Sequence, residues 1–240
     1  MKMKMSPRET MKNFLEFMKQ HHQKPEWNDT KNFVHEMFEH PESEFEDWDP
    51  KDWVNNPKFL ENIRDPQYRQ WTSELNSFWK KLGRKISDEV KQNQELHSII
   101  YVPHPVIVPG GRFREFYYWD SYWIVRGLLL SEMTSTVKGM LENFLHMVRI
   151  YNFVPNGGRV YYTRRSQPPL LIPMIKSYFD KTNDKQFIKE NIDLIEQEFL
   201  FWMTNHTVII EKDGKKYKLA RYFAPSDGPR PESYRLVQHD

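Results

Sequence analysis

The sequence has no cysteine, few glycines and no excess of charge of either sign. Its 240 residues include nine Gly, 35 Lys and Arg, and 33 Asp and Glu, which gives a formal net charge of +2 at pH 7. The lack of Cys excludes a disulfide framework, a thiol nucleophile and thiolate metal ligands. Because the charges nearly cancel, composition gives no electrostatic signature of nucleic-acid or anionic-membrane binding. We therefore expect no nucleic-acid partner.

The sequence also lacks a long apolar run. The longest one lies near Trp123–Leu130 and contains Arg126, whereas a membrane-spanning helix needs roughly 18 or more apolar residues. The first five residues, in which Met and Lys alternate, do not contain the apolar core of a signal peptide. We expect either a cytosolic protein or a chain that is not the complete precursor.

Aromatic residues make up 15% of the sequence and charged residues 28%. This aromatic content supplies enough apolar area for a folded core, so the composition argues against disorder. The length fits one large domain or two small ones.

Helix signals dominate the chain and predict an all-α fold of stacked antiparallel helix pairs. Ser6 and Glu9 form a capping box, and Asp65-Pro66 opens another helix that ends at Gly83. Asp213-Gly214 predicts a type I′ β-hairpin between residues 206–212 and 215–222. In the helix after Pro66 we expect a buried stripe of Trp71, Leu75, Phe78 and Leu82. Further helices are expected at about residues 32–39, 87–95, 119–133, 135–151, 168–180 and 185–204, and a long loop at 101–118.

Three loops combine Arg, carboxylates or amides, aromatic rings and rigid Gly or Pro: residues 109–120, 155–169 and 227–235. Arg guanidinium groups and carboxylates form hydrogen bonds with hydroxyl groups, and aromatic rings stack on the C–H face of a sugar. This mixture favours a neutral, hydroxyl-rich ligand such as a sugar. A phosphate ligand is not favoured, because the sequence has no Walker-type phosphate loop.

Each loop also has a structural interpretation. A single Arg–acid pair in a loop is more often a salt bridge, and Asp120 also suits the first turn of a helix. Asn156-Gly157 fits a simple turn, and for Trp123 we favour a core position. The occurrence of three such loops in one chain favours a ligand site.

Metal binding is not indicated. His35 and His40 are five residues apart, so the two rings do not share a helix face, and we expect no metal. Asn28 and Asn205 begin N-glycosylation sequons, which favour a secreted glycoprotein.

At residues 109–122, Pro-Gly-Gly-Arg-Phe-Arg-Glu and the following Tyr-Trp-Asp-Ser-Tyr resemble the first signature of the α,α-trehalase family of glycoside hydrolases. The blocks at 155–157, 165–169 and 229–233 resemble the next family motifs in order. The match runs from about Phe33 to Arg235 and is similar to insect and animal members. It implies that residues 1–240 are the N-terminal portion of one catalytic domain. The resemblance further implies that the domain is an (α/α)6 barrel, present here as about its first half with a small β-hairpin.

The resemblance implies hydrolysis of trehalose to two glucose molecules, with inversion and without a cofactor. It implies a secreted or membrane-anchored extracellular enzyme, with any anchor outside this segment. By motif match, the substrate contacts implied are Arg112, Trp119, Asp120, Asn156, Arg165, Ser166, Gln167, Arg230 and Glu232.

Two family motifs are missing. In the family that the sequence resembles, the general acid is an Asp in a Gly-Trp-Asp block and the general base is a Glu nearer the C-terminus. Neither block occurs before Asp240. The matched loops contain four carboxylates, and we assign neither catalytic role to any of them: Glu115, Asp120, Asp227 and Glu232. We therefore expect the isolated chain to be inactive.

Three alternatives remain open at this point: another (α/α)-barrel glucosidase, a non-catalytic sugar-binding protein, or a purely structural helical protein. One smaller departure from the family is Asn152, where a Gly is expected in a turn.

Overall fold

The computed structural model describes residues 2–40, 44–165 and 167–224. Two compact units divide the chain: unit 1 contains residues 1–47 and 85–101, and unit 2 contains residues 48–84 and 102–240. The described residues are helix-rich with a few short strands, which agrees with the expected all-α class.

In unit 1, the capping box predicted at Ser6 is present, because the Ser6 side chain accepts a hydrogen bond from the Glu9 backbone N–H. The rings of Phe17 and Phe33 stack with centroids 4.6 Å apart, which joins the first two helices. The second helix begins at Trp27, five residues before the predicted start. The elements of this unit are α1 (Pro7–Gln20), α2 (Trp27–Met37), β1 (Phe45–Asp47), α4 (Asp88–Gln92) and η2 (Gln94–Leu96).

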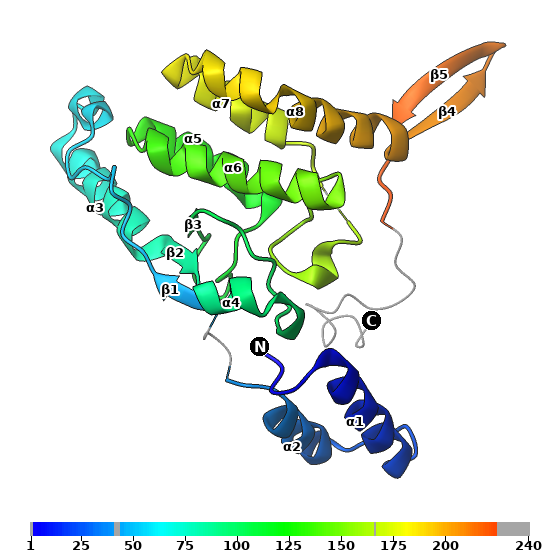
Figure 1. Cartoon of the computed structure of the whole chain (residues 1–240). Helices are drawn as coiled ribbons and strands as arrows, with labels where there is room; N and C mark the ends of the chain where they lie inside the picture. The colour runs from blue at the N-terminus through cyan, green and yellow to red at the C-terminus, as the bar shows by residue number, and fades with distance from the viewer. Residues whose placement is uncertain (1, 41–43, 166, 225–240) are drawn as a thin grey trace. The chain divides into compact units, whose positions relative to one another are not determined.

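In unit 2, helices α5 to α8 lie alongside one another in Figure 1. Helix α5 contacts α7, α6 contacts α8, and each consecutive pair, α5–α6 and α7–α8, is also in contact. Val125, Leu128, Leu141 and Met174 are fully buried in this core. The helices are α3 (Pro66–Leu82), α5 (Tyr118–Leu130), α6 (Thr134–Tyr151), α7 (Leu171–Thr182) and α8 (Lys185–Asn205), with short turns η1 (Lys58–Asn62) and η3 (Val160–Tyr162).

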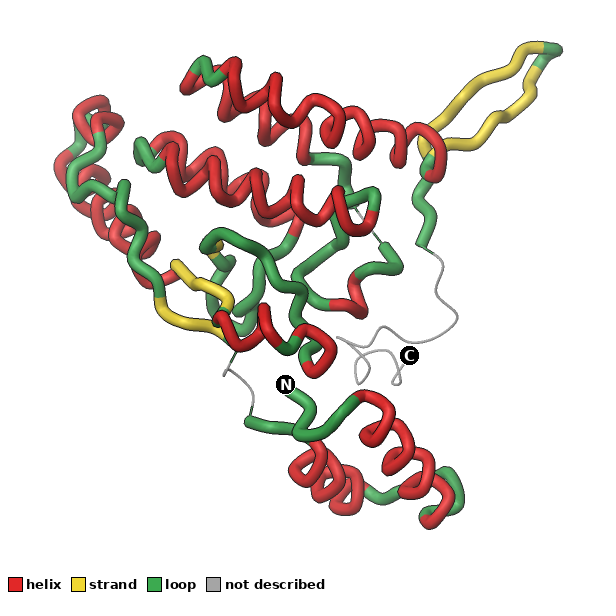
Figure 2. Tube along the Cα trace, viewed as in Figure 1, coloured by secondary structure: helices red, strands yellow, loops and turns green. Residues whose placement is uncertain are grey.

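Short antiparallel strands accompany these helices. Strand β2 (Gly83–Ile86) pairs antiparallel with β3 (Val106–Ile107), with Gly83 opposite Ile107. Strands β4 (Thr207–Lys212) and β5 (Lys215–Ala220) form the hairpin that follows α8 and is drawn yellow in Figure 2. Asp213 and Gly214 both have positive φ, at 53° and 70°, which confirms the type I′ turn.

The burial predicted for α3 is wrong for three of the four residues, and the fourth, Leu82, is half-buried. Trp71, Leu75 and Phe78 are 56%, 40% and 47% exposed. The opposite face is used instead: Trp53 Nε1 donates to the Asn76 backbone carbonyl, and the Asn76 side chain donates to Val54 O. An apolar stripe shows which residues share a helix face, but burial depends on what the fold places against that face.

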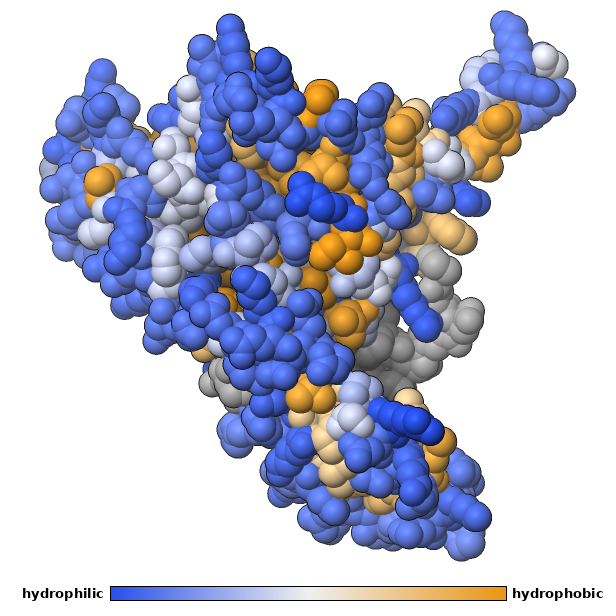
Figure 3. All heavy atoms as spheres, viewed as in Figure 1, coloured by the Kyte–Doolittle hydropathy of each residue, from blue (hydrophilic) through white to orange (hydrophobic). Residues whose placement is uncertain are grey.

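Trp123 is 55% exposed, so the predicted core position is also wrong. Figure 3 shows further apolar surface over the helices of unit 2 and on one side of the hairpin. Among the described helices, none is both long and apolar enough to cross a bilayer. Asn28 and Asn205 are exposed, and their glycosylation stays a prediction.

Candidate functional site

A cavity of about 580 Å³ lies in unit 2 where two of the predicted loops meet the starts of helices. Its size falls within the range of small-molecule sites. Its lining residues are Tyr117, Trp119, Asp120, Asn156, Gln167, Pro168 and Tyr222. Four of these were predicted from the sequence: Trp119, Asp120, Asn156 and Gln167.

The first loop turns sharply before α5. Gly110 and Gly111 have φ of 98° and 60°, and the backbones of Gly110 and Phe113 exchange hydrogen bonds of 3.2 and 3.1 Å. Gly adopts such φ values at low cost because it has no Cβ atom. The chain then enters α5, whose first turn carries Trp119 and Asp120 into the cavity wall.

Arg112 is placed differently from the prediction. Its guanidinium lies 4.9 Å from the centre of the Phe113 ring, and the side chain is exposed. Arg112 is not among the residues that line the cavity. The structure therefore does not bring it together with Trp119 and Asp120.

The second loop joins the first through the backbone. Tyr117 and Gly157 form an isolated antiparallel bridge, and Gly158 N donates to Phe116 O at 3.1 Å. A Cβ atom on Gly158 would lie 2.5 Å from Phe116 Cε1. The two glycines after Asn156 therefore allow two loops to approach closely. The sequence had suggested only a simple turn at this position.

The far end of the second loop is fixed to its beginning. Asn156 N donates to Arg165 O at 2.9 Å, and the Arg165 guanidinium lies 5.4 Å from the centre of the Tyr162 ring. Arg165 is half-buried but does not line the cavity, whereas Gln167 and the cis-bonded Pro168 do. The remaining predicted contacts, Ser166, Arg230 and Glu232, lie outside the described residues.

Burial shapes the chemistry of the lining. It raises the pKa of Asp120, although the backbone N–H of Asp120 itself opposes the rise. Burial and the charge of Glu115 raise the pKa of Tyr117. Arg159 Nε lies 2.8 Å from Glu115 Oε1, both largely buried, so this Arg–acid pair is the structural salt bridge considered from the sequence.

Sequence reasoning missed three lining residues: Tyr117, Pro168 and Tyr222. Tyr117 and Pro168 lie within the predicted loops, and their place in those loops is the one sequence feature that could have indicated a contact with the cavity. Tyr222 follows the hairpin and belonged to no motif, so its role depends on the course of the chain after β5. In the described ranges, no three His, Cys, Asp or Glu residues form a group suited to a metal ion.

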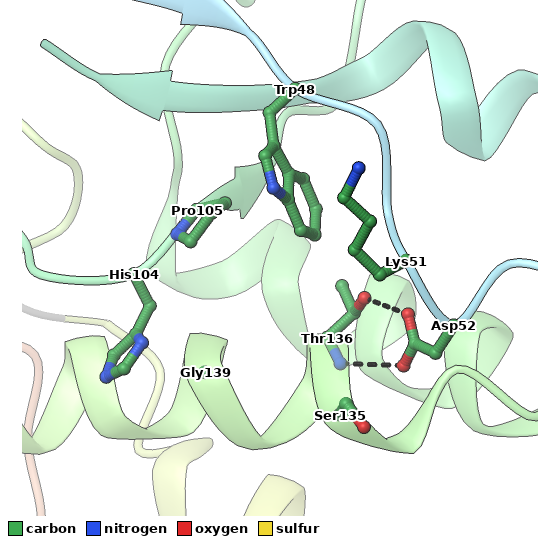
Figure 4. Close-up of a pocket in the computed structure, with 8 residues that line it drawn as sticks. All are labelled: Trp48, Lys51, Asp52, His104, Pro105, Ser135, Thr136 and Gly139. Atoms are coloured by element: carbon green, nitrogen blue, oxygen red, sulfur yellow. Dashed lines mark hydrogen bonds between the residues drawn. The ribbon is translucent and has the colours of Figure 1, made fainter.

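A second cavity, of about 370 Å³, lies between the loop after Trp48 and helix α6 (Figure 4). Asp52 accepts hydrogen bonds from the backbone N–H and the hydroxyl of Thr136, at 2.8 and 2.5 Å. His104 Nε2 lies 3.0 Å from Glu142 Oε2. Asp52 therefore holds the first turn of α6, and His104 pairs with a residue farther along the same helix.

Replacing Asp52 with Ala should lower the free energy of unfolding by about 1 kcal/mol, the usual cost of losing a carboxylate at a helix N-terminus. Urea denaturation measures this difference. Ser135→Ala is the matched control, because Ser135 is exposed in the same wall and should change stability by less than about 0.5 kcal/mol. An unchanged Asp52→Ala midpoint would contradict this assignment.

Comparison with known proteins identifies the family. The family model described as trehalase matches residues 1–239. The chain belongs to the trehalase family. It is 61% identical to the trehalase of Apis mellifera over 98% of its length, 50% identical to that of Homo sapiens over 98%, and 40% identical to that of Arabidopsis thaliana over 84%. It covers 38%, 40% and 33% of those three relatives, so it spans well under half of their length.

Proposed function

We propose that this chain forms the substrate-binding part of an α,α-trehalase, which hydrolyses trehalose to two glucose molecules with inversion. One observation carries the proposal: the family match runs through residues 1–239, and four family-motif residues line one cavity. Those four are Trp119, Asp120, Asn156 and Gln167.

Each lining residue suits a sugar in a different way. The exposed Trp119 ring offers a flat apolar face for the C–H side of a glucose ring. Asp120 accepts hydrogen bonds from hydroxyl groups, while Asn156 and Gln167 both donate and accept them. We assign the same hydroxyl-binding role to Arg112, Arg165, Ser166, Arg230 and Glu232 on the family motifs alone.

The bond-breaking groups are proposed to lie beyond these 240 residues. An inverting glycosidase needs an acid and a base whose carboxyls are about 6.5–9.5 Å apart, with water between the base and the sugar. In the described part of the chain, Asp120 is the one carboxylate that lines the cavity. A single carboxylate cannot supply both roles, so at least one of the two groups must come from elsewhere in the protein.

The same proposal extends to the architecture. Contacts of α5 with α7 and of α6 with α8 place successive helix hairpins side by side. This is the arrangement that six hairpins would repeat in an (α/α)6 barrel. Residues 1–240 would then contribute roughly its first half.

Glucose release from trehalose tests the proposal on the protein expressed from its full reading frame. Proton NMR at early times should show one α- and one β-glucose from each trehalose, because inversion changes one of the two anomeric centres. The isolated 240-residue chain should release none. Turnover by that chain, or faster hydrolysis of other α-glucosides than of trehalose by the full-length protein, would contradict the proposal.

Sugar binding without hydrolysis is the second candidate for the 240-residue chain itself. The single carboxylate in the lining favours it. Calorimetric titration with trehalose tests this second candidate: saturable binding by the chain supports a binding function, and no heat change argues against one.

A further inference from the structure

We infer that Tyr118, which does not line the cavity, is the positioning residue that sets three cavity walls relative to one another. These walls are the start of α5 with Trp119 and Asp120, the second loop at Asn156, and the segment Gln167–Pro168 before α7. The inference rests on the proposed function. Tyr118 is fully buried at the start of α5, directly before Trp119 and Asp120.

Three hydrogen bonds connect Tyr118 to the rest of the site. Its backbone N–H donates to Asn156 O at 3.1 Å, which fixes the second loop. Its hydroxyl accepts a bond of 2.8 Å from the backbone N–H of Leu171, the first residue of α7. The same hydroxyl donates to Glu198 Oε1 at 2.7 Å.

Leu171 connects this bond to the third wall. Gln167 and Pro168 line the cavity just before α7 begins, and Leu171 is fully buried. A phenol has one proton and free lone pairs, so it can donate to Glu198 while it accepts from Leu171. No apolar side chain of the same shape can do either.

Glu198 is the anchor on α8. Its side chain is 1% exposed, and Oε1 also accepts a 2.8 Å bond from Trp202 Nε1 one turn later. Burial raises the pKa of Glu198, and burial together with the charge of Glu198 raises the pKa of Tyr118 well above its usual value. The Tyr118 hydroxyl therefore keeps its proton at physiological pH and continues to donate.

Removal of the hydroxyl leaves a buried donor at Leu171 and takes one donor from Glu198. Such unpaired buried groups are costly, so the start of α7 should shift relative to the start of α5. A displacement of about 1 Å in a site can lower a rate about 100-fold without loss of any direct substrate contact.

The test is Tyr118→Phe in the protein expressed from its full reading frame. We expect kcat/KM for trehalose to fall about 10- to 100-fold, mainly through a higher KM, because the displaced walls bind substrate. Tyr178→Phe is the matched control: Tyr178 is 4% exposed and donates to Asp184 Oδ2 at 2.9 Å, but it does not line the cavity. It should lose similar stability and keep wild-type kinetics.

The conservative variant separates positioning from bulk stability. Glu198→Gln keeps an acceptor oxygen for Tyr118 and Trp202 and should retain kcat/KM within about threefold, whereas Glu198→Leu should match Tyr118→Phe. If Tyr118→Phe fails to fold, this pair alone decides the question. Equal kcat/KM in Tyr118→Phe and Tyr178→Phe, or in the Gln and Leu variants, overturns the inference.

Hydrogen exchange at the Leu171 amide gives a readout that does not depend on hydrolysis. We expect faster exchange at this amide in Tyr118→Phe than in Tyr178→Phe, and equal exchange overturns the positioning role. A wild-type protein without trehalose hydrolysis instead overturns the proposed function. The two failures are therefore distinguishable.

Discussion

Replacing Asp120 with Asn should lower kcat/KM for trehalose about 10- to 100-fold in the full-length protein. Asp120 is the one carboxylate in the described lining of the cavity, and a hydrogen bond to a charged group contributes about 1.5–3 kcal/mol. Each 1.4 kcal/mol corresponds to a factor of ten. Asn keeps the shape of the side chain, so the loss reports its charge.

Steady-state kinetics checks this result, with Asp180→Asn as the control. Asp180 is an exposed carboxylate on α7 that pairs with Lys176 and does not line the cavity, so its replacement should leave kcat/KM unchanged. Because burial raises the pKa of Asp120, trehalose affinity should fall as the pH is lowered through that raised value. Wild-type kinetics in Asp120→Asn would remove Asp120 from the site.

The sequence correctly predicted the features that depend only on residues close together in the chain. The Ser6–Glu9 capping box and the Asp213-Gly214 turn formed as expected, because side chain and backbone satisfy each other within the same turn. Asn152 adopts φ of 67° at the end of α6, so Asn serves there where the family motif led us to expect Gly. These features need no information about the rest of the fold.

Predictions that depended on distant partners were less successful. The apolar stripe of α3 was identified correctly as a stripe, but the side turned to Trp53 and Val54 is the one that carries Asn76. Helix α7 begins at Leu171, three residues after the predicted start, and Pro168 belongs to the cavity wall.

The candidate site shows the same division. Motifs at 119–120, 156 and 167 correctly predicted four lining residues. A motif match identifies such residues directly, so their geometry did not have to be derived. Arg112 stands in the same motif, yet its side chain lies over Phe113. The link between Tyr118 and Glu198 spans 80 positions, and no local pattern predicts a partner at that distance.

Replacing Gly158 with Ala should lower the free energy of unfolding by about 1–3 kcal/mol, the usual cost of overpacking a filled core. The added Cβ would lie 2.5 Å from Phe116 Cε1, and Phe116 is 2% exposed, so the ring has little room to move. Gly158 has no positive φ of the kind that favours glycine, so Ala adds no backbone strain there. Urea denaturation measures the loss.

A double-mutant cycle with Phe116→Leu isolates the collision from other effects. If contact with the ring is the cause, Gly158→Ala should cost at least about 1 kcal/mol less in the Leu background than in the wild type. Equal costs in both backgrounds would show that the ring is not the obstacle. Because Gly158 N donates to Phe116 O two residues after Asn156, the same substitution should also weaken trehalose binding. Asn156 stands in the same loop pair and lines the cavity, so the stability of the loop pair and the affinity of the site should fall together.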